Sequence, residues 1–455
     1  MAAANGNLGA AADRHLHDRL PGHLLPAYVR NPRPLALRCG VQHYGWGDKT
    51  FIANLLGAPS PAERPQAELW IGAHPDLPAS ACLAPSHGVP LDWVIAAAPD
   101  AVLGAGTAAA FGGELPFLFK VLAAAMPLSI QAHPNRAEAE RGFAQEERLG
   151  IPADDPTRNY RDRNHKPELL VALTDFHALR GFRPLEEIAI ELARYPVLAG
   201  LGAQLDGSAA GLRRLYADFM RLPQADVDAL LGPVLVQSRR RANDDSDPGR
   251  ERCRRLLHAD GLFSAGGHHD RGLLSFLLLN LLHLRPGEAI YLPAGELHSY
   301  LEGAGLELMA NSNNVLRGGL TRKHIDVDAL LEVLHVDPHD PEIIRPRSEA
   351  GHPDVLAYDT PAAEFALRRL RLPASARHEI APDSVLLGLV VEGAVEISGA
   401  GTVLALAKGG CFLLPAGCAA CIQAGSDADL ALATVPDAAG PALVNGASRP
   451  GKHSA

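Results

Sequence analysis

The sequence predicts a mainly β protein with an α-helical insertion, built as two β-sandwiches plus a helical domain. Short apolar runs separated by Gly and Pro fill both ends of the chain, which has 44 Gly and 36 Pro in 455 residues. A central block instead has apolar residues at three- and four-residue spacing, as amphipathic helices do. A strand–turn–strand pattern occurs once in each β-rich part at identical spacing. These observations together give the fold class.

The composition is that of a globular protein, with 47% hydrophobic and 21% charged residues. A net charge of −10 argues against a nucleic-acid partner, which needs a basic surface. Six cysteines in so long a chain imply no disulfide framework. The N-terminus has no apolar signal region and no stretch of 18 apolar residues occurs. We therefore expect a cytoplasmic protein that does not span a membrane.

Changes in composition divide the chain into segments. The Pro-broken start and the end after Pro436 lack periodic apolar patterns, and a Pro-rich, charged linker precedes the last β-rich block. We expect a mobile leader at 1–34, a first sandwich domain at 35–184 and 281–340, a helical insertion domain at 185–280, a second sandwich domain at 346–436, and a frayed tail at 437–455.

One helix is expected inside the first β-rich segment, with Asn135 as its N-cap and Gly150 at its end. In the helical block, the runs 185–201, 211–223 and 226–241 carry the helical spacing. The block also has clusters of arginine, such as Arg239–Arg241 and Arg252–Arg255. These are expected to be solvated helix faces.

The repeated pattern is a Gly, five residues, Pro-Ala-Gly and two further residues, and it starts at Gly287 and at Gly409. It describes a strand, a tight turn and a returning strand. The pattern resembles the second motif of the cupin jelly roll, in which the residue after the turn is a metal-binding His. The first copy ends at His298 and the second at Ala420. We therefore expect a metal in the first sandwich and none in the second.

Further ligands can come from Gln131 and His133, which share one face of a strand because side chains alternate along it. Glu168 opens another strand-like run and would complete four-coordination of a zinc ion. Since His298 follows the helical block, the chain must return to the same sheet for these residues to meet. The residues alone also allow His133 to cap the helix at Asn135, with Glu168 a surface acid.

Many separate blocks resemble the type I phosphomannose isomerases, in the right order from about residue 40 to 330, with a weaker match to about 435. The resemblance implies two cupin sandwiches, of which the first is catalytic. It implies one zinc ion per chain, bound by Gln131, His133, Glu168 and His298. The blocks are YGWG, AELWIGAHP, LPFLFKVL, PLSIQAHP, RNHKPEL, FHALRGFRP, GEAIYLPAGELHSYLEG and ELMANSNNVLRGGLTRKHIDV.

The implied reaction interconverts mannose 6-phosphate and fructose 6-phosphate through a cis-enediol, a step in carbohydrate metabolism and GDP-mannose biosynthesis. The resemblance implies a catalytic Arg317. Lys166 offers a point charge or a base, and Gly318-Gly319 beside Arg317 would let the backbone approach a ligand. For the remaining candidates, a structural role in apolar packing or in a buried ion pair is an alternative to substrate binding. The candidate substrate contacts are Trp46, Ser129, Tyr300 and Glu307.

Two features depart from a simple assignment. Asn313 stands where the family usually has Asp, and an amide cannot act as a general base. Cys418 and Cys421 have CxxC spacing, for which adjacent buried thiols are favoured over a redox or zinc pair.

Three other functions compete with the isomerase. An iron dioxygenase with two cupin domains fits poorly with Gln131, Glu168 and Arg317. A non-catalytic sugar-binding cupin stays open because of Asn313. A bifunctional guanylyltransferase needs a Gly-rich nucleotide-binding domain that the N-terminal part lacks. The expected partner is a small sugar phosphate, and the expected state is a monomer.

Overall fold

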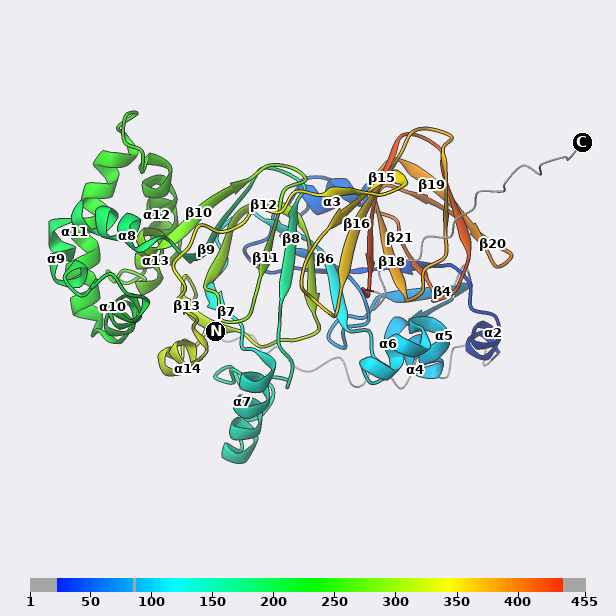
Figure 1. The fold of residues 1–455 in the computed structure, drawn as a ribbon, viewed down its shortest axis with the longest axis horizontal. Coiled ribbons are helices and arrows are strands. Elements are labelled where there is room, and N and C mark those ends of the chain that lie inside the picture. Colours follow the sequence, from blue (N-terminus) through cyan, green and yellow to red (C-terminus); the bar gives the residue numbers. More distant parts are fainter. Residues whose placement is uncertain (1–22, 85–86, 437–455) are drawn as a thin grey trace, which may run out of the picture.

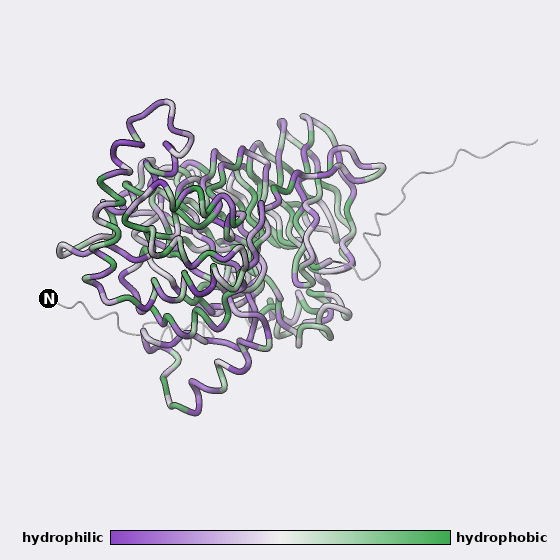
Figure 2. The backbone as a smooth tube through the Cα atoms, turned by 60° about the vertical axis from the view of Figure 1, so that its left-hand side comes forward, coloured by the Kyte–Doolittle hydropathy of each residue, from purple (hydrophilic) through white to green (hydrophobic). Residues whose placement is uncertain are grey.

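The computed structural model describes residues 23–84 and 87–436, so the tail at 437–455 and most of the leader lie outside the described residues. The protein is mixed, with somewhat more strand than helix, and has a helical block at one end and β-sheets through the rest (Figure 1). Hydrophobic stretches gather inside the molecule and hydrophilic ones follow many of the outward loops (Figure 2). No helix in these ranges is long and apolar enough to cross a membrane.

The first sheet is antiparallel and joins strands from both sides of the helical block. Its main path runs β10-β9-β12-β6-β3-β2, while β8 pairs with β11 and β12, and β7 pairs with β12 and β13. The strands are β2 (Gly40–Gln42), β3 (Glu68–Ile71), β6 (Phe117–Ala124), β7 (Ile130–Ala132), β8 (Glu168–Ala172), β9 (Phe176–Phe182), β10 (Leu279–Leu284), β11 (Ala289–Leu292), β12 (His298–Ala310) and β13 (Leu316–Gly319).

Two further sheets face each other across an apolar core that includes Phe412 and Ile422. One contains, in spatial order, β14 (Arg347–Glu349), β15 (His352–Tyr358), β16 (Ala366–Leu372), β23 (Ala428–Thr434), β18 (Leu386–Glu392), β21 (Cys411–Leu414), β1 (Leu35–Arg38), β4 (Ser80–Ala84) and β5 (His87–Pro90). The other contains β17 (Arg377–Ile380), β22 (Ala420–Ala424), β19 (Ala394–Gly399) and β20 (Thr402–Ala407).

The larger of these two sheets does not follow the segments expected from the sequence. β1, β4 and β5 belong to the expected first domain, yet β1 pairs with β21, with Leu37 opposite Cys411. A strand edge left open is a liability, and β21 gains a partner from the start of the chain. The helices α4 (Leu91–Ala97), α5 (Pro99–Leu103) and α6 (Ala105–Ala110) lie near this junction (Figure 1).

The prediction of a mobile leader is wrong for its last part. Leu24–Arg30 forms a helix, α2, and its Tyr28 is fully buried in the main apolar core. Burial of one aromatic side chain fixes a segment whose sequence shows no long periodic pattern.

The predicted helix in the first β-rich segment is confirmed as α7 (Arg136–Leu149). Asn135 accepts a hydrogen bond from the backbone N–H of Glu138, while the Glu138 carboxylate accepts one from the backbone N–H of Asn135, which forms a capping box. Gly150 ends the helix in the left-handed conformation, with φ of 70°. Both signals are local, so the sequence alone was sufficient to locate this helix.

The two copies of the repeated pattern fold alike. β11 and β12 flank the first turn, and β21 and β22 flank the second. The turn glycines Gly295 and Gly417 have φ of 78° and 69°, which residues with a Cβ rarely adopt. Nearby, Cys418 is buried and Cys421 is half-buried, and both thiols are free.

A block of helices lies between the two parts of the first sheet in the chain. It packs on that sheet through a core that joins Phe219 and Leu235 to Phe182 and Leu316. A short helix after the sheet, α14 (Val327–Val333), contributes to the same core. The helices of the block are α8 (Leu185–Ala193), α9 (Ala199–Gly202), α10 (Ala209–Arg221), α11 (Gln224–Ala242), α12 (Arg250–Phe263) and α13 (Ser275–Leu278), with 3-10 turns η1 (Pro196–Leu198) and η2 (Arg271–Leu274).

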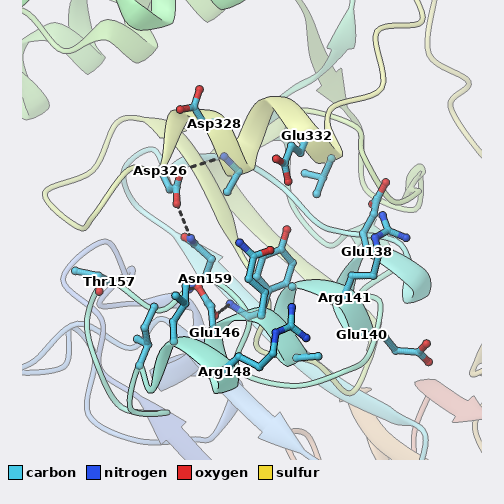
Figure 3. A pocket seen from close by; sticks show the side chains of 18 of the residues that line it. Glu138, Glu140, Arg141, Glu146, Arg148, Thr157, Asn159, Asp326, Asp328 and Glu332 are labelled. Atoms are coloured by element: carbon cyan, nitrogen blue, oxygen red, sulfur yellow. Dashed lines mark hydrogen bonds between the residues drawn. The ribbon is translucent and has the colours of Figure 1, made fainter.

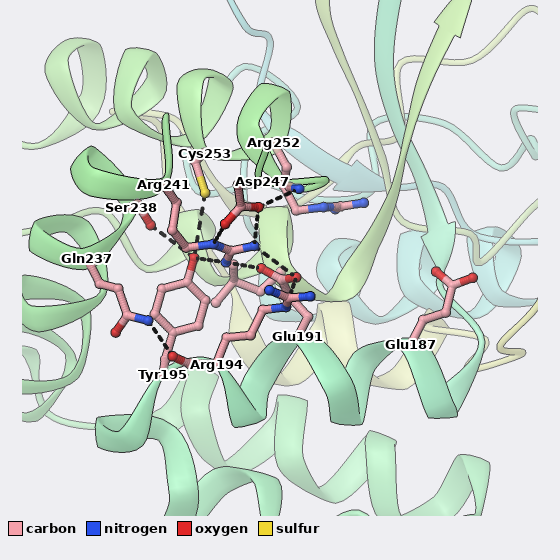
Figure 4. Close-up of polar contacts among 12 residues, drawn as sticks. Glu187, Glu191, Arg194, Tyr195, Gln237, Ser238, Arg241, Asp247, Arg252 and Cys253 are labelled. Carbon is pink, nitrogen blue, oxygen red and sulfur yellow. Dashed lines mark hydrogen bonds and ion pairs between the residues drawn. The ribbon is translucent and has the colours of Figure 1, made fainter. Parts of the chain in front are cut away.

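The expectation of solvated arginine faces is wrong for Arg241, which is 7% exposed. Figure 4 shows the polar contacts around it. Its guanidinium contacts the carboxylates of Glu191 at 2.6 Å and Asp247 at 2.8 Å and donates to the Tyr195 hydroxyl at 2.7 Å. Arg252 is half-buried and donates to the Phe276 and Leu279 carbonyls. Helical spacing turns these two arginines inward, while Arg239 and Arg240 are exposed.

We expect Arg241→Met to destabilise the helical block by about 3 kcal/mol, because it removes the nearest cation from two largely buried carboxylates. The measurement is urea unfolding followed by far-ultraviolet circular dichroism. Arg240→Met, one position earlier on the same helix and exposed, should change the stability by less than about 0.5 kcal/mol. Equal losses in the two variants would contradict this account of the network.

Candidate active site

The four predicted ligands converge on one buried point. Gln131 lies on β7, His133 follows that strand, Glu168 begins β8 and His298 begins β12. Pairing of β12 with β7 sets His298 opposite Gln131, and the rings of His133 and His298 have centroids 5.0 Å apart. The return of the chain to one sheet after the helical block therefore brings these residues together.

The distances suit a metal centre. His133 Nε2 lies 3.4 Å from Glu168 Oε1, and His298 Nε2 lies 3.4 Å from Glu168 Oε2. Potential ligand atoms of these three residues are all within 4.8 Å of one another, and each residue is 1% exposed. The Gln131 side-chain amide is also adjacent, with its Nε2 3.3 Å from His298 Nε2.

Hydrogen bonds behind the two imidazoles orient them for binding a cation. Nδ1–H of His133 donates to the Asn314 carbonyl at 2.8 Å, and Nδ1–H of His298 donates to the Glu296 carbonyl at 3.0 Å. Both Nε2 lone pairs therefore face the cluster. His133 Nε2 and Glu168 Oε2 are buried without a hydrogen-bond partner. Two imidazoles, a carboxylate and these unsatisfied atoms fit a zinc ion.

The charges support the same interpretation. Burial, followed by the nearby Lys166 cation, lowers the pKa of His133 to about 4, so its ring is neutral at pH 7 as a ligand must be. Burial alone would raise the pKa of Glu168, but Lys166 and His133 hold it well below its usual range. Lys166 Nζ lies 2.9 Å from Glu168 Oε1.

Lys166 connects this cluster to a cavity of about 570 Å³. The cavity is rich in cationic side chains, including Arg161, Arg317 and Lys323. Burial, followed by the charge of Arg161, lowers the pKa of Arg317, which reflects two crowded guanidinium groups. A site with this excess of positive charge is suited to a phosphate group.

Arg317 is held in place from two sides. On one side β13 pairs with β7, with Arg317 opposite Gln131. On the other side the carboxylate of Asp270 accepts the backbone N–H of Leu320 at 2.8 Å. Gly319 has φ of 141° and a Cβ there would lie 2.3 Å from the Gly272 Cα. Gly319 therefore permits close packing against the helical block. The sequence had instead suggested that it lets the backbone approach a ligand.

Of the four candidate substrate contacts, Ser129 and Tyr300 lie beside the metal cluster, and the rings of Tyr300 and His298 have centroids 6.2 Å apart. Trp46 is half-buried and stacks on Tyr44 with ring centroids 5.7 Å apart. Ser129 donates to Gln131 Oε1 at 3.3 Å. Tyr300 is 2% exposed with an unpartnered hydroxyl, and Glu307 accepts a hydrogen bond from Lys120 at 2.9 Å. The residues that line the cavity do not include these four.

Sequence reasoning missed four cationic residues that line the cavity, namely Lys120, Arg161, Arg322 and Lys323. Lys120 could have been found, since it lies in the apolar run LPFLFKVL, and all of β6 is buried. A buried lysine inside a strand needs partners, here Glu307 and Glu68. Nothing in their local sequence separates Arg161 and Lys323 from ordinary surface cations.

Asn313 also lines the cavity, and its amide donates to the Asp76 carboxylate at 3.1 Å. The departure from the family pattern at this position therefore lies next to an acid supplied by a different segment. Asp162 accepts the Asn313 backbone N–H at 2.6 Å and fixes the same loop.

A larger cavity of about 900 Å³ lies between α7 and α14 (Figure 3). It is lined by several acids, and at least four are already engaged, including Glu138 in the capping box of α7 and Asp328 in an ion pair with Arg221. Asp326 caps α14 and accepts from Asn159, and Glu146 accepts the backbone N–H of Tyr160. Within the described ranges, the cluster that could hold a metal is that of His133, Glu168 and His298. That cluster marks the candidate active site.

Known proteins match this chain over most of its length. The model of the type I phosphomannose isomerase catalytic domain matches residues 35–185. The Escherichia coli K12 mannose-6-phosphate isomerase is 43% identical over 295 residues, 64% of this chain and 72% of that protein. The human mannose-6-phosphate isomerase is 33% identical over 389 residues, 80% of this chain and 88% of that protein.

Solved structures of mannose 6-phosphate isomerases also match this chain in fold. The Salmonella typhimurium mannose 6-phosphate isomerase bound to its substrate and a zinc atom has a TM-score of 0.78 and 34% identity, and the match covers 88% of this chain and 99% of that one. A lysine-to-alanine mutant of the phosphomannose isomerase from the same organism matches with a TM-score of 0.79 at the same coverage. Sequence and fold together show that the chain belongs to the type I phosphomannose isomerases, the family of mannose-6-phosphate isomerases.

Proposed function

We propose that this protein is a zinc-dependent isomerase that interconverts mannose 6-phosphate and fructose 6-phosphate through a cis-enediol intermediate. The observation that carries the proposal is a buried cluster of His133, Glu168 and His298 directly beside a cationic cavity. Membership of the family supports it, as does a relative solved with its substrate and zinc.

We assign the metal site to His133, Glu168 and His298 with Gln131 as the fourth ligand. The Gln131 amide already faces the cluster, and a half turn about its last bond exchanges nitrogen for oxygen within the same volume. One zinc ion per chain would polarise and orient the oxygens at the reacting carbons of the sugar. The second sandwich has Ala420 at the position equivalent to His298 and is assigned no metal.

Arg317 is assigned to the negative charge of the substrate. Its planar fork can bind two oxygens of a phosphate or of the enediolate, and Arg161 and Lys323 line the same cavity. Because β13 is anchored by the helical block through Asp270, the fork is held before the substrate arrives.

Lys166 is assigned to the proton-transfer region, because it both lines the cavity and contacts Glu168. Isomerisation moves a proton from C2 to C1 and builds negative charge on the sugar oxygens. A protonated Lys166 stabilises that charge, and a neutral one takes the C2 proton. Trp46, Ser129, Tyr300 and Glu307 do not line the cavity, so we assign them to the layer behind its lining, where they would support the residues that orient the sugar.

The sheets support a division into two cupin jelly-roll sandwiches and a helical insertion. We assign residues 35–184 and 281–340 to the catalytic sandwich, 185–280 to the insertion and 346–436 to the sandwich without metal. β1, β4 and β5 join the second sandwich across this division. We further propose a monomer that works in the cytoplasm on a small sugar phosphate.

The purified protein should convert mannose 6-phosphate to fructose 6-phosphate, as measured in a coupled assay. A strong chelator should abolish the activity, and added zinc should restore it. An iron dioxygenase would instead consume oxygen, and a non-catalytic sugar-binding protein would bind the phosphate without turnover. Absence of isomerisation by zinc-loaded protein would contradict the proposed function.

Metal analysis should give about one zinc per chain, and His298→Ala should lose both zinc and activity because it removes a buried ligand. The matched control is His378→Ala, a change in the second sandwich, which should keep zinc and turnover. A His298→Ala protein with full zinc occupancy would contradict the assigned site.

Arg317→Lys keeps the charge but loses the fork, so kcat/KM should fall by roughly 10²-fold with zinc content unchanged. A fall in kcat would assign Arg317 to the transition state, and a rise in KM alone would assign it to phosphate capture. Arg322→Lys is the control, since this exposed arginine lines the same cavity. Parental constants in the Arg317 variant would contradict either role.

A further inference from the structure

A loop of the second sandwich contacts segments that adjoin the candidate active site. Glu364 lies between β15 and β16, and it is 5% exposed. Its neighbours Ala362 and Phe365 belong to the main apolar core, which also includes Leu169 and Val171 of β8. The loop therefore shares one apolar core with the strand that begins with the proposed zinc ligand Glu168.

The Glu364 carboxylate contacts two segments that carry site residues. Its Oε1 lies 2.6 Å from His165 Nε2 and 3.4 Å from a terminal nitrogen of Arg136. His165 directly precedes Lys166 in the chain, and Arg136 follows His133 by three positions. One buried oxygen therefore joins the segment of Lys166 to the segment of His133.

The carboxylate is ionised in this position. Burial alone would raise the pKa of Glu364, but the hydrogen bond and charge of His165, its own backbone N–H and Arg136 hold the pKa below its usual range. A buried carboxylate that has lost its partner is costly, so the loop and His165 constrain each other. The backbone at Asn164 is also fixed, since its carbonyl accepts the Asn314 amide at 2.9 Å.

We propose that Glu364 is a positioning residue for the active site: through His165 it holds Lys166 and the start of β8 in the geometry that isomerisation needs. The second sandwich, which is assigned no metal, would thus contribute to catalysis in the first. This inference rests on the proposed function, since it assigns Lys166 to the reaction. It involves no contact of Glu364 with substrate.

The test compares Glu364→Gln with wild type under zinc saturation. Glutamine keeps the volume but loses the charge, so kcat should fall roughly 10-fold or more, as expected when catalytic groups shift by a fraction of an ångström. KM and zinc content should change little. Glu364→Asp keeps the charge on a shorter side chain and should recover part of the loss in kcat.

A matched control is Glu349→Gln. Glu349 belongs to the same sandwich, has a similarly buried side chain and pairs with Arg368 at 2.5 Å. The Glu349→Gln variant should lower the melting temperature by about as much as Glu364→Gln does, while leaving kcat unchanged. If both variants have the parental kcat, or both lose it equally, Glu364 is structural and the inference is overturned.

If Glu364→Gln fails to fold, a variant of its partner His165 tests whether the contact between them positions the active site. His165→Gln alters a partly exposed side chain, and it should lower kcat as Glu364→Gln does. Where both single variants fold, the double variant should lose little more, because they break one interaction. A folded His165→Gln protein with parental kcat would overturn the inference. Failure of wild type to isomerise mannose 6-phosphate would instead contradict the proposed function.

Discussion

The central constraint in this fold is that β12 must pair with strands that come much earlier in the sequence. It pairs with β6, β7, β8 and β9, and its first residue is His298. Those strands supply Gln131 and Glu168 and lead directly into His133. A metal cluster can form only when the helical block between β9 and β10 lets the chain return. The site is therefore a product of long-range strand pairing.

Charge is organised in two zones around that strand. Inside the sheet, Lys120 lies between Glu68 and Glu307, and Lys166 lies against Glu168, so each buried cation has a carboxylate. Toward the cavity, cations such as Arg317 exceed the acids. Paired charges are tolerated in the interior because they compensate each other's loss of water. The unbalanced zone is the one that can attract an anionic substrate.

Each of the other parts of the molecule contacts a segment of the site through one carboxylate, which is half-buried for Asp270 and buried for Glu364. Asp270 of the helical block binds the Leu320 backbone and fixes the strand of Arg317. Glu364 of the second sandwich binds His165 next to Lys166. A hydrogen bond to a buried acid is directional and costly to break, so each contact holds a loop more firmly than apolar packing would.

The sequence by itself located α7 through Asn135 and Gly150, both repeated hairpins, and the residues that converge near His298, because these signals are local or are carried by specific motifs. Tertiary structure alone decided that Arg241 is buried, that Gly319 packs against the helical block, and that β1 joins β21. Local propensity specifies which element forms. Which face is buried, and which strands become neighbours, depends on partners far away in the chain.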